Sequence, residues 1–89
     1  MRLAVLASGS GTNLQAILDS CNGGSIPAKV VTVISDNKDA YALKRGDKYN
    51  VPSYFIDSAN YKNREDMDRE IVNILKQHNV ELVILAGYM

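Results

Sequence analysis

The stretch LASGSGTNLQAIL, residues 6–18, joins an apolar run to an amphipathic run through glycines and small polar residues. Gly9 and Gly11 carry no side chain, so the backbone can turn sharply there and a ligand can approach it closely. Thr12 and Asn13 follow at once, where a helical pattern begins. Free N–H groups at a helix start, together with the helix dipole, favour an anion. The stretch is therefore typical of a phosphate-binding loop or of a tight turn capped by Thr12.

Four short apolar runs predict four β-strands. They cover residues 3–7, 30–34, 53–56 and 82–86. The first, second and fourth runs (LAVLA, VVTVI and LVIL) are nearly continuous in apolar residues, which is typical of parallel strands covered on both faces. The third run, SYFI, is shorter and more polar, so we expect it at an edge of the sheet.

Helical patterns separate these runs. The first helical pattern carries an apolar stripe at positions i, i+3, i+4 and i+7, formed by Leu14, Ile17, Leu18 and Cys21. Gly23 and Gly24 follow this stripe and end the pattern. The second covers residues 40–49 and is weakened by Gly46, at a cost of about 1 kcal/mol. Asn50 can close this helix in the left-handed conformation. The third begins at the cap residue Asn63, and its buried stripe is Met67, Ile71, Ile74 and Leu75.

The element order βαβαβαβ predicts an open, doubly wound α/β fold. Right-handed crossovers make the sheet mostly parallel and Rossmann-like, with strand order 3-2-1-4. The direction of winding reverses between the first and fourth strands, and ligands bind in the crevice beyond the carboxyl ends of such strands. Residues 8–13 and 86–89 are therefore expected to meet there.

Composition narrows the classes of function. Lys plus Arg and Asp plus Glu number 10 each, so long-range attraction to nucleic acid or to an anionic membrane is not expected. No apolar run approaches the ~20 residues of a membrane span. Cys21 is the single cysteine, which predicts a buried thiol and a reducing, cytoplasmic environment. No His, Cys and Asp cluster has metal-ligand spacing, so we expect no metal.

Several residues leave alternatives open. Leu14 breaks the G-x-G-x-x-G fingerprint of dinucleotide-binding folds, although Asp36 lies where a ribose-binding acid would be. The segment SDNKD around Asp36 is equally an ordinary polar turn. Arg64 begins the third helix, where a cation opposes the dipole, so it is either a ligand contact or an exposed surface arginine. His78, at the other end of that helix, is expected to be structural.

Four segments together resemble the glycinamide ribonucleotide transformylase family of purine biosynthesis. They are LASGSGTNLQAIL, SDNKDAYAL, NREDMDREI and LVILAGYM, and the similarity covers the whole chain. The motif G-x-G-[ST]-N-L-Q-A separates this family from other folate-dependent formyltransferases on the same fold. The resemblance implies formyl transfer from the cosubstrate 10-formyltetrahydrofolate to the amine of glycinamide ribonucleotide.

The resemblance also implies roles for individual residues. Gly11, Thr12 and Asn13 match the segment that holds the substrate phosphate, Gly87 matches the substrate crevice, and Arg64 and Met89 match folate contacts. The catalytic Asn, His and Asp of the family all lie beyond the fourth strand, so none is assigned within this chain.

The run LVIL is apolar on both faces and would form an exposed, pairing-prone sheet edge. We therefore expect residues 1–89 to be the amino-terminal, substrate-phosphate-binding portion of a formyltransferase domain roughly twice as long, inactive on its own. A homodimer is left open. The alternatives are an NAD(P)-binding Rossmann domain of an oxidoreductase and a non-catalytic phosphate-binding module.

Overall fold

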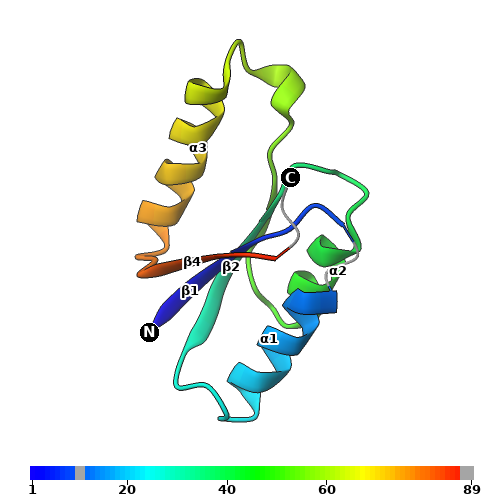
Figure 1. Cartoon of the computed structure of the whole chain (residues 1–89), viewed down its shortest axis with the longest axis vertical. Coiled ribbons are helices and arrows are strands. Elements are labelled where there is room, and N and C mark those ends of the chain that lie inside the picture. The colour runs from blue at the N-terminus through cyan, green and yellow to red at the C-terminus, as the bar shows by residue number, and fades with distance from the viewer. Residues whose placement is uncertain (10–11, 87–89) are drawn as a thin grey trace.

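A sheet of four parallel strands forms the centre of the molecule (Figure 1). The computed structural model describes residues 1–9 and 12–86. The strands are β1 (Arg2–Leu6), β2 (Lys29–Ser35), β3 (Ser53–Phe55) and β4 (Leu82–Leu85). Their spatial order is β3-β2-β1-β4, which confirms the predicted order and places the short, polar β3 at an edge.

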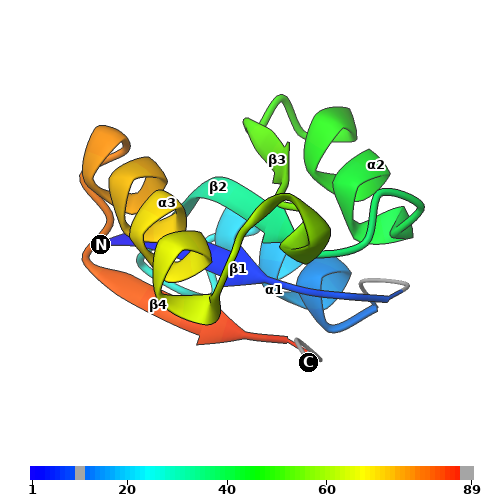
Figure 2. The ribbon, with the colours of Figure 1, turned by 90° about the horizontal axis from the view of Figure 1, so that it is seen from above.

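Helices cover both faces of the sheet. They are α1 (Thr12–Asn22), α2 (Tyr41–Lys48) and α3 (Arg64–Gln77), with a short 3-10 turn η1 (Ser58–Asn60) before α3. Figures 1 and 2 show α1 and α2 on one side of the strands and α3 on the other. The fold is therefore doubly wound, as predicted.

A β-bulge in β2 decides which of its side chains face which helices. β2 pairs with β1 through Leu3↔Val30 and then Ala4↔Thr32, so Val31 is an extra residue opposite β1. Val30 and Val33 consequently share the α1 and α2 side instead of pointing to opposite faces. The buried Thr32 donates a 3.0 Å hydrogen bond from Oγ1 to the carbonyl of Pro52. Strict two-residue alternation would have missed this arrangement.

Gly46 is required by the packing of α2 on the sheet. A Cβ atom at this position would collide with Ser53 Oγ and lie 3.2 Å from Val33 Cγ2. The glycine that weakened the helix in the sequence pattern is thus the residue that lets α2 approach β2 and β3 closely. Asn50 follows with a φ of 58°, the left-handed conformation predicted for the end of this segment.

α3 begins and packs as its sequence predicts. Asn63 Oδ1 accepts a 2.9 Å hydrogen bond from the Asp66 N–H, which caps the first turn. Met67, Ile71 and Ile74 are buried against Leu6 and Ile34 of the sheet, and Leu75 lies at the margin of this cluster.

Large apolar side chains are exposed along the β4 edge of the sheet. β4 is an edge strand on which Leu82, Val83 and Leu85 are 48%, 38% and 66% exposed, so the predicted apolar edge is confirmed.

Over residues 1–9 and 12–86, no helix is both long and apolar enough to cross a membrane.

Cys21 is half-buried, and the prediction of a buried thiol was wrong. It lies in the last turn of α1, where the chain turns away from the sheet before β2 begins. A cavity of about 320 Å³ remains there, lined by Leu18, Cys21, Val30 and Tyr49 among others.

Candidate functional site at the start of α1

The segments that follow β1 and β4 leave the sheet as neighbours. The Ala86 N–H donates a 2.8 Å hydrogen bond to the Leu6 carbonyl, and the Ala7 N–H donates a 3.0 Å bond to the Ile34 carbonyl. Both segments therefore lie at the carboxyl edge of the sheet, as predicted for the crevice. The predicted site residues Gly11, Gly87 and Met89 lie outside the described residues.

Thr12 and Asn13 are the first two residues of α1, and both are exposed. The backbone N–H groups of a first helical turn have no partner within the helix, and the helix dipole adds partial positive charge there. The first turn of α1 carries no acidic side chain. Nothing in that turn therefore repels an anion.

Gly9 is not required by the fold. Its φ lies outside the left-handed range, and among the described residues no atom lies within 4 Å of a Cβ built on it. Its backbone is nevertheless held in place, because the Ala42 N–H donates to the Gly9 carbonyl at 3.4 Å. The Asn37 side-chain amide also donates to the Ser8 carbonyl at 3.3 Å. The backbone at Gly9 is therefore tethered, and no atom of the described residues fills the place of a side chain there.

The segment after β2 is a hydrogen-bonded polar turn. The Asn37 N–H donates to Ser35 Oγ at 3.1 Å, and the Asp39 N–H donates to Asn37 Oδ1 at 3.0 Å. This geometry matches the ordinary-turn interpretation of SDNKD. Asp36 Oδ1 is buried and has no hydrogen-bond partner in the described part of the chain.

Four polar side chains tie α1 to α2 behind the candidate site. Gln15 Oε1 accepts from Arg45 Nη1 at 2.9 Å, while Gln15 Nε2 donates to Asp19 Oδ1 at 2.9 Å and to Tyr49 Oη at 2.7 Å. The Tyr49 hydroxyl donates to Asp19 Oδ1 at 2.5 Å. We call Gln15, Asp19, Arg45 and Tyr49 the α1–α2 tie.

The hydrogen bonds of the α1–α2 tie shift the pKa values of Asp19 and Tyr49. The hydrogen bond from Tyr49, followed by that from Gln15, lowers the pKa of the Asp19 carboxyl from its ordinary value of 3.8. The same bond to Asp19 raises the pKa of the Tyr49 phenol from 10.0. The sequence pattern did not predict this tie. Its only signal was the i, i+4 spacing of Gln15 with Asp19 and of Arg45 with Tyr49, which does not reveal that the two helices meet.

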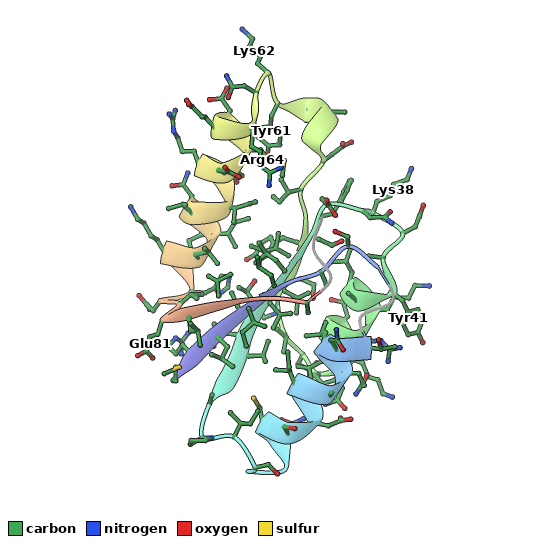
Figure 3. The ribbon with its side chains drawn as sticks, viewed as in Figure 1. Lys38, Tyr41, Tyr61, Lys62, Arg64 and Glu81 are labelled. Carbon is green, nitrogen blue, oxygen red and sulfur yellow. The ribbon has the colours of Figure 1, made fainter. Side chains whose placement is uncertain are left out.

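Arg64 is the first residue of α3 and is highly exposed. Its side chain is 68% exposed, and its Nε lies 3.9 Å from Asp68 Oδ1, a loose surface ion pair. Figure 3 shows the side chain on the side of α3 that faces the segment between β3 and η1. Because β3 leads through η1 into α3, the start of α3 lies toward the carboxyl edge of the sheet.

His78 lies at the opposite end of α3 and has a structural role, as predicted. Its Nε2 is 2.7 Å from Tyr54 Oη, and its carbonyl accepts a 2.9 Å hydrogen bond from Arg2 Nε at the beginning of β1. No group of three or more His, Cys, Asp or Glu side chains within the described ranges could hold a metal ion.

Comparisons with known proteins agree on one family. The profile described as formyl transferase matches residues 1–89. Phosphoribosylglycinamide formyltransferase of Haemophilus influenzae is 46% identical over 88 residues, which cover 99% of this chain and 42% of that protein. The Escherichia coli protein of the same name is 35% identical over 89 residues, covering 100% of this chain and 42% of that protein.

Solved structures extend this likeness to the fold. Glycinamide ribonucleotide transformylase 1 from Symbiobacterium toebii superposes with a TM-score of 0.97 at 49% identity, covering 100% of this chain and 42% of that one. Phosphoribosylglycinamide formyltransferase from Bacillus halodurans gives a TM-score of 0.96 at 37% identity, covering 100% of this chain and 46% of that one. The chain thus spans less than half the length of these relatives. Because the family profile matches it from end to end, this chain belongs to the formyl transferase family.

Proposed function

We propose that this chain supplies the substrate-phosphate-binding portion of an enzyme that transfers a formyl group from 10-formyltetrahydrofolate to glycinamide ribonucleotide. The observation that carries the proposal is the tethered backbone at Gly9, where, among the described residues, no atom lies within 4 Å of an added Cβ and no packing contact demands a glycine. The reaction is inferred from proteins named phosphoribosylglycinamide formyltransferase that resemble the whole of this chain.

The start of α1 would hold the phosphate of the substrate. The N–H groups of Gly11, Thr12 and Asn13 would donate to its oxygens, and the Thr12 hydroxyl and Asn13 amide would add donors. A phosphate monoester carries about −1.5 to −2 charge at neutral pH. Each charge-assisted hydrogen bond contributes roughly 1.5–3 kcal/mol. Two or three such bonds account for tight, orientation-specific binding.

The contribution of this chain to the reaction is positional. The substrate amine attacks the formyl carbon, so a new C–N bond and an oxyanion form, and a base removes the amine proton. Collapse of the oxyanion then breaks the bond from the formyl carbon to the folate nitrogen, which takes up a proton and leaves as tetrahydrofolate. We assign none of those chemical roles to residues 1–89. Anchoring the phosphate end places the amine at a set distance from the formyl carbon, which lowers the entropic part of the barrier.

The folate would lie toward the start of α3. Arg64 offers an exposed guanidinium, which suits the carboxylates of a folate, and within residues 1–9 and 12–86 it forms a loose ion pair with Asp68. From the resemblance of LVILAGYM to the family we place Gly87 in the substrate crevice and Met89 in the folate pocket, although both lie outside the described residues. A homodimer of the intact enzyme is compatible with this arrangement.

A dinucleotide-binding role has less support. In the G-x-G-x-x-G fingerprint the third glycine allows helix and strand to pack closely. Leu14 occupies that position and is fully buried in the core between α1 and the sheet. Tight binding of NADH to the chain would nevertheless overturn the formyl-transfer proposal.

A chimera tests the proposal directly. Residues 1–89 replace the matching segment of the Haemophilus influenzae relative, and formyl transfer to glycinamide ribonucleotide is assayed. Thr12→Ala and Asn13→Ala should each raise KM for glycinamide ribonucleotide about tenfold, as expected for one lost charge-assisted bond, and leave KM for the formyl donor unchanged. Asn22→Ala, at the exposed far end of the same helix, is the matched control. Equal effects of Asn13→Ala and Asn22→Ala would contradict the placement of the phosphate.

A further inference from the structure

We propose that Arg45 and Gln15 are positioning residues for the phosphate site, acting through the α1–α2 tie. The inference rests on the proposed function, since it concerns the same start of α1. Neither residue is among the residues assigned to the substrate or to the folate.

Gln15 is held in one orientation. Its carbonyl oxygen accepts from Arg45, and its amide nitrogen donates to both Asp19 and Tyr49, so both amide protons are used. Rotating the amide by 180° would place a donor against the guanidinium and an acceptor against the carboxylate. The side chain therefore specifies one placement of α1 against α2.

The first turn of α1 is rigidly linked to Gln15. Gln15 lies three residues after Thr12, that is, on the adjacent turn of the same face. A shift of α1 that breaks the Gln15 bonds also moves the N–H groups at its start. The α1–α2 tie thus sets the direction in which these N–H groups point.

Arg45 contacts both α1 and α2. Its Nη1 donates to Gln15, and its Cζ lies 4.7 Å from the centroid of the Tyr41 ring, a cation–π contact. Ala42, which follows Tyr41 on α2, donates its N–H to the Gly9 carbonyl. The start of α2 therefore holds the loop before α1 directly, while Arg45 holds α1 itself. Helix α2 therefore contacts both parts of the site: the loop at Gly9 and helix α1 at Gln15.

Charge alone does not explain this arrangement. Lys44 carries the same charge on the same helix, and its Nζ lies 5.8 Å from the centroid of the Tyr41 ring. Among the described residues, however, Lys44 donates no hydrogen bond to α1. Lys44→Gln and Arg45→Gln remove one positive charge each from neighbouring positions. Only Arg45→Gln removes the bond to Gln15. The pair therefore separates positioning from general electrostatic attraction.

Ribose 5-phosphate is the probe for the first test. The ¹⁵N-labelled chain is titrated, and the amide resonances of Thr12 and Asn13 report binding. Arg45→Gln should raise Kd roughly tenfold, the loss expected if misdirected N–H groups give up about one charge-assisted hydrogen bond to the phosphate. Lys44→Gln should change Kd less than about twofold, as expected for a screened surface charge. Arg45→Lys, which retains one donor, should recover part of the loss.

Gln15→Glu gives a second, nearly isosteric variant. It keeps an acceptor for Arg45 but cannot donate to Asp19 or Tyr49, and it places a like charge beside Asp19. It should weaken phosphate binding although its size is unchanged. In the chimera, Arg45→Gln should raise KM for glycinamide ribonucleotide while kcat and KM for the formyl donor stay within about twofold.

The outcomes distinguish this inference from the proposed function. If the wild-type chain shows no phosphate-dependent shift at Thr12 or Asn13, the phosphate site itself fails and the positioning role fails with it. If the wild type binds and Arg45→Gln binds equally well, only the positioning role is wrong. Equal losses in Lys44→Gln and Arg45→Gln would assign the effect to charge. Urea unfolding of each variant gives the folded fraction, so a loss of stability without a change in Kd also overturns the inference.

Discussion

Gly9 and Gly46 occupy comparable places, each where backbone lies close to the α1 and α2 side of the sheet, but for opposite reasons. A Cβ on Gly46 would collide with Ser53 Oγ and press on Val33, so packing demands the glycine. A Cβ on Gly9 would meet nothing among the described residues within 4 Å. Packing explains Gly46, whereas the described residues give no packing reason for Gly9. A residue type that the fold does not need is the better guide to a binding site.

Gly46→Val should show the largest effect, a loss of about 3 kcal/mol in the free energy of unfolding, because a side chain is forced into a packed interface. Urea unfolding of the chain measures it. Gly46→Ala should cost less, since helix propensity offsets part of the strain. Adding Ser53→Gly to Gly46→Ala should restore stability by removing the colliding hydroxyl. A Gly46→Val variant as stable as the wild type would contradict the claim that packing requires a glycine at this position.

Gly9→Val should leave stability within about 0.5 kcal/mol, because the position is open and its φ is ordinary. The same variant should raise Kd for ribose 5-phosphate roughly thirtyfold, since the side chain fills the space in front of the loop. Amide titration and urea unfolding on one sample give both numbers. Unchanged phosphate binding would mean that the open space at Gly9 is unrelated to a ligand.

Arg64→Ala should have a smaller effect, about a fivefold rise in KM for the formyl donor in the chimera with no change for glycinamide ribonucleotide. Arg69 is the matched control, because it is also an exposed arginine of α3 whose Nη1 lies 3.9 Å from a carboxylate, that of Asp66. Arg69→Ala should change neither KM. Identical behaviour of the two variants would make Arg64 a surface arginine.

The smallest effect concerns pH. The lowered pKa of Asp19 contributes stability that is present above 3.8 and is lost as pH falls through the lowered folded-state value. The raised pKa of Tyr49 contributes stability that is present below 10.0 and is lost as pH rises through the raised folded-state value. Tyr49→Phe should flatten both ends of the curve of unfolding midpoint against pH. Because the Asp19 carboxylate is exposed and Tyr49 is only half-buried, solvent screens their interaction and the difference from wild type should be slight at neutral pH.

Local patterns were sufficient for most of the fold. The four apolar runs became strands in the predicted order, and Asn63 and Asn50 adopted the cap and left-handed conformations expected of them. These features depend on neighbours a few residues away, which is the range that a sequence pattern contains. The prediction of a buried Cys21 was wrong, because its exposure depends on how the chain after α1 rejoins the sheet.

The sequence by itself determined the element order, the parallel sheet and a glycine loop followed by Thr12 and Asn13, because periodicity and backbone preference are local properties. Only the tertiary structure decided which glycine is structural, where the β2 bulge redirects side chains, and that Arg45 reaches Gln15 across 30 residues of sequence. Such contacts arise because two helices pack side by side on one face of the sheet. Their distances and directions exist only once the strands between them have paired.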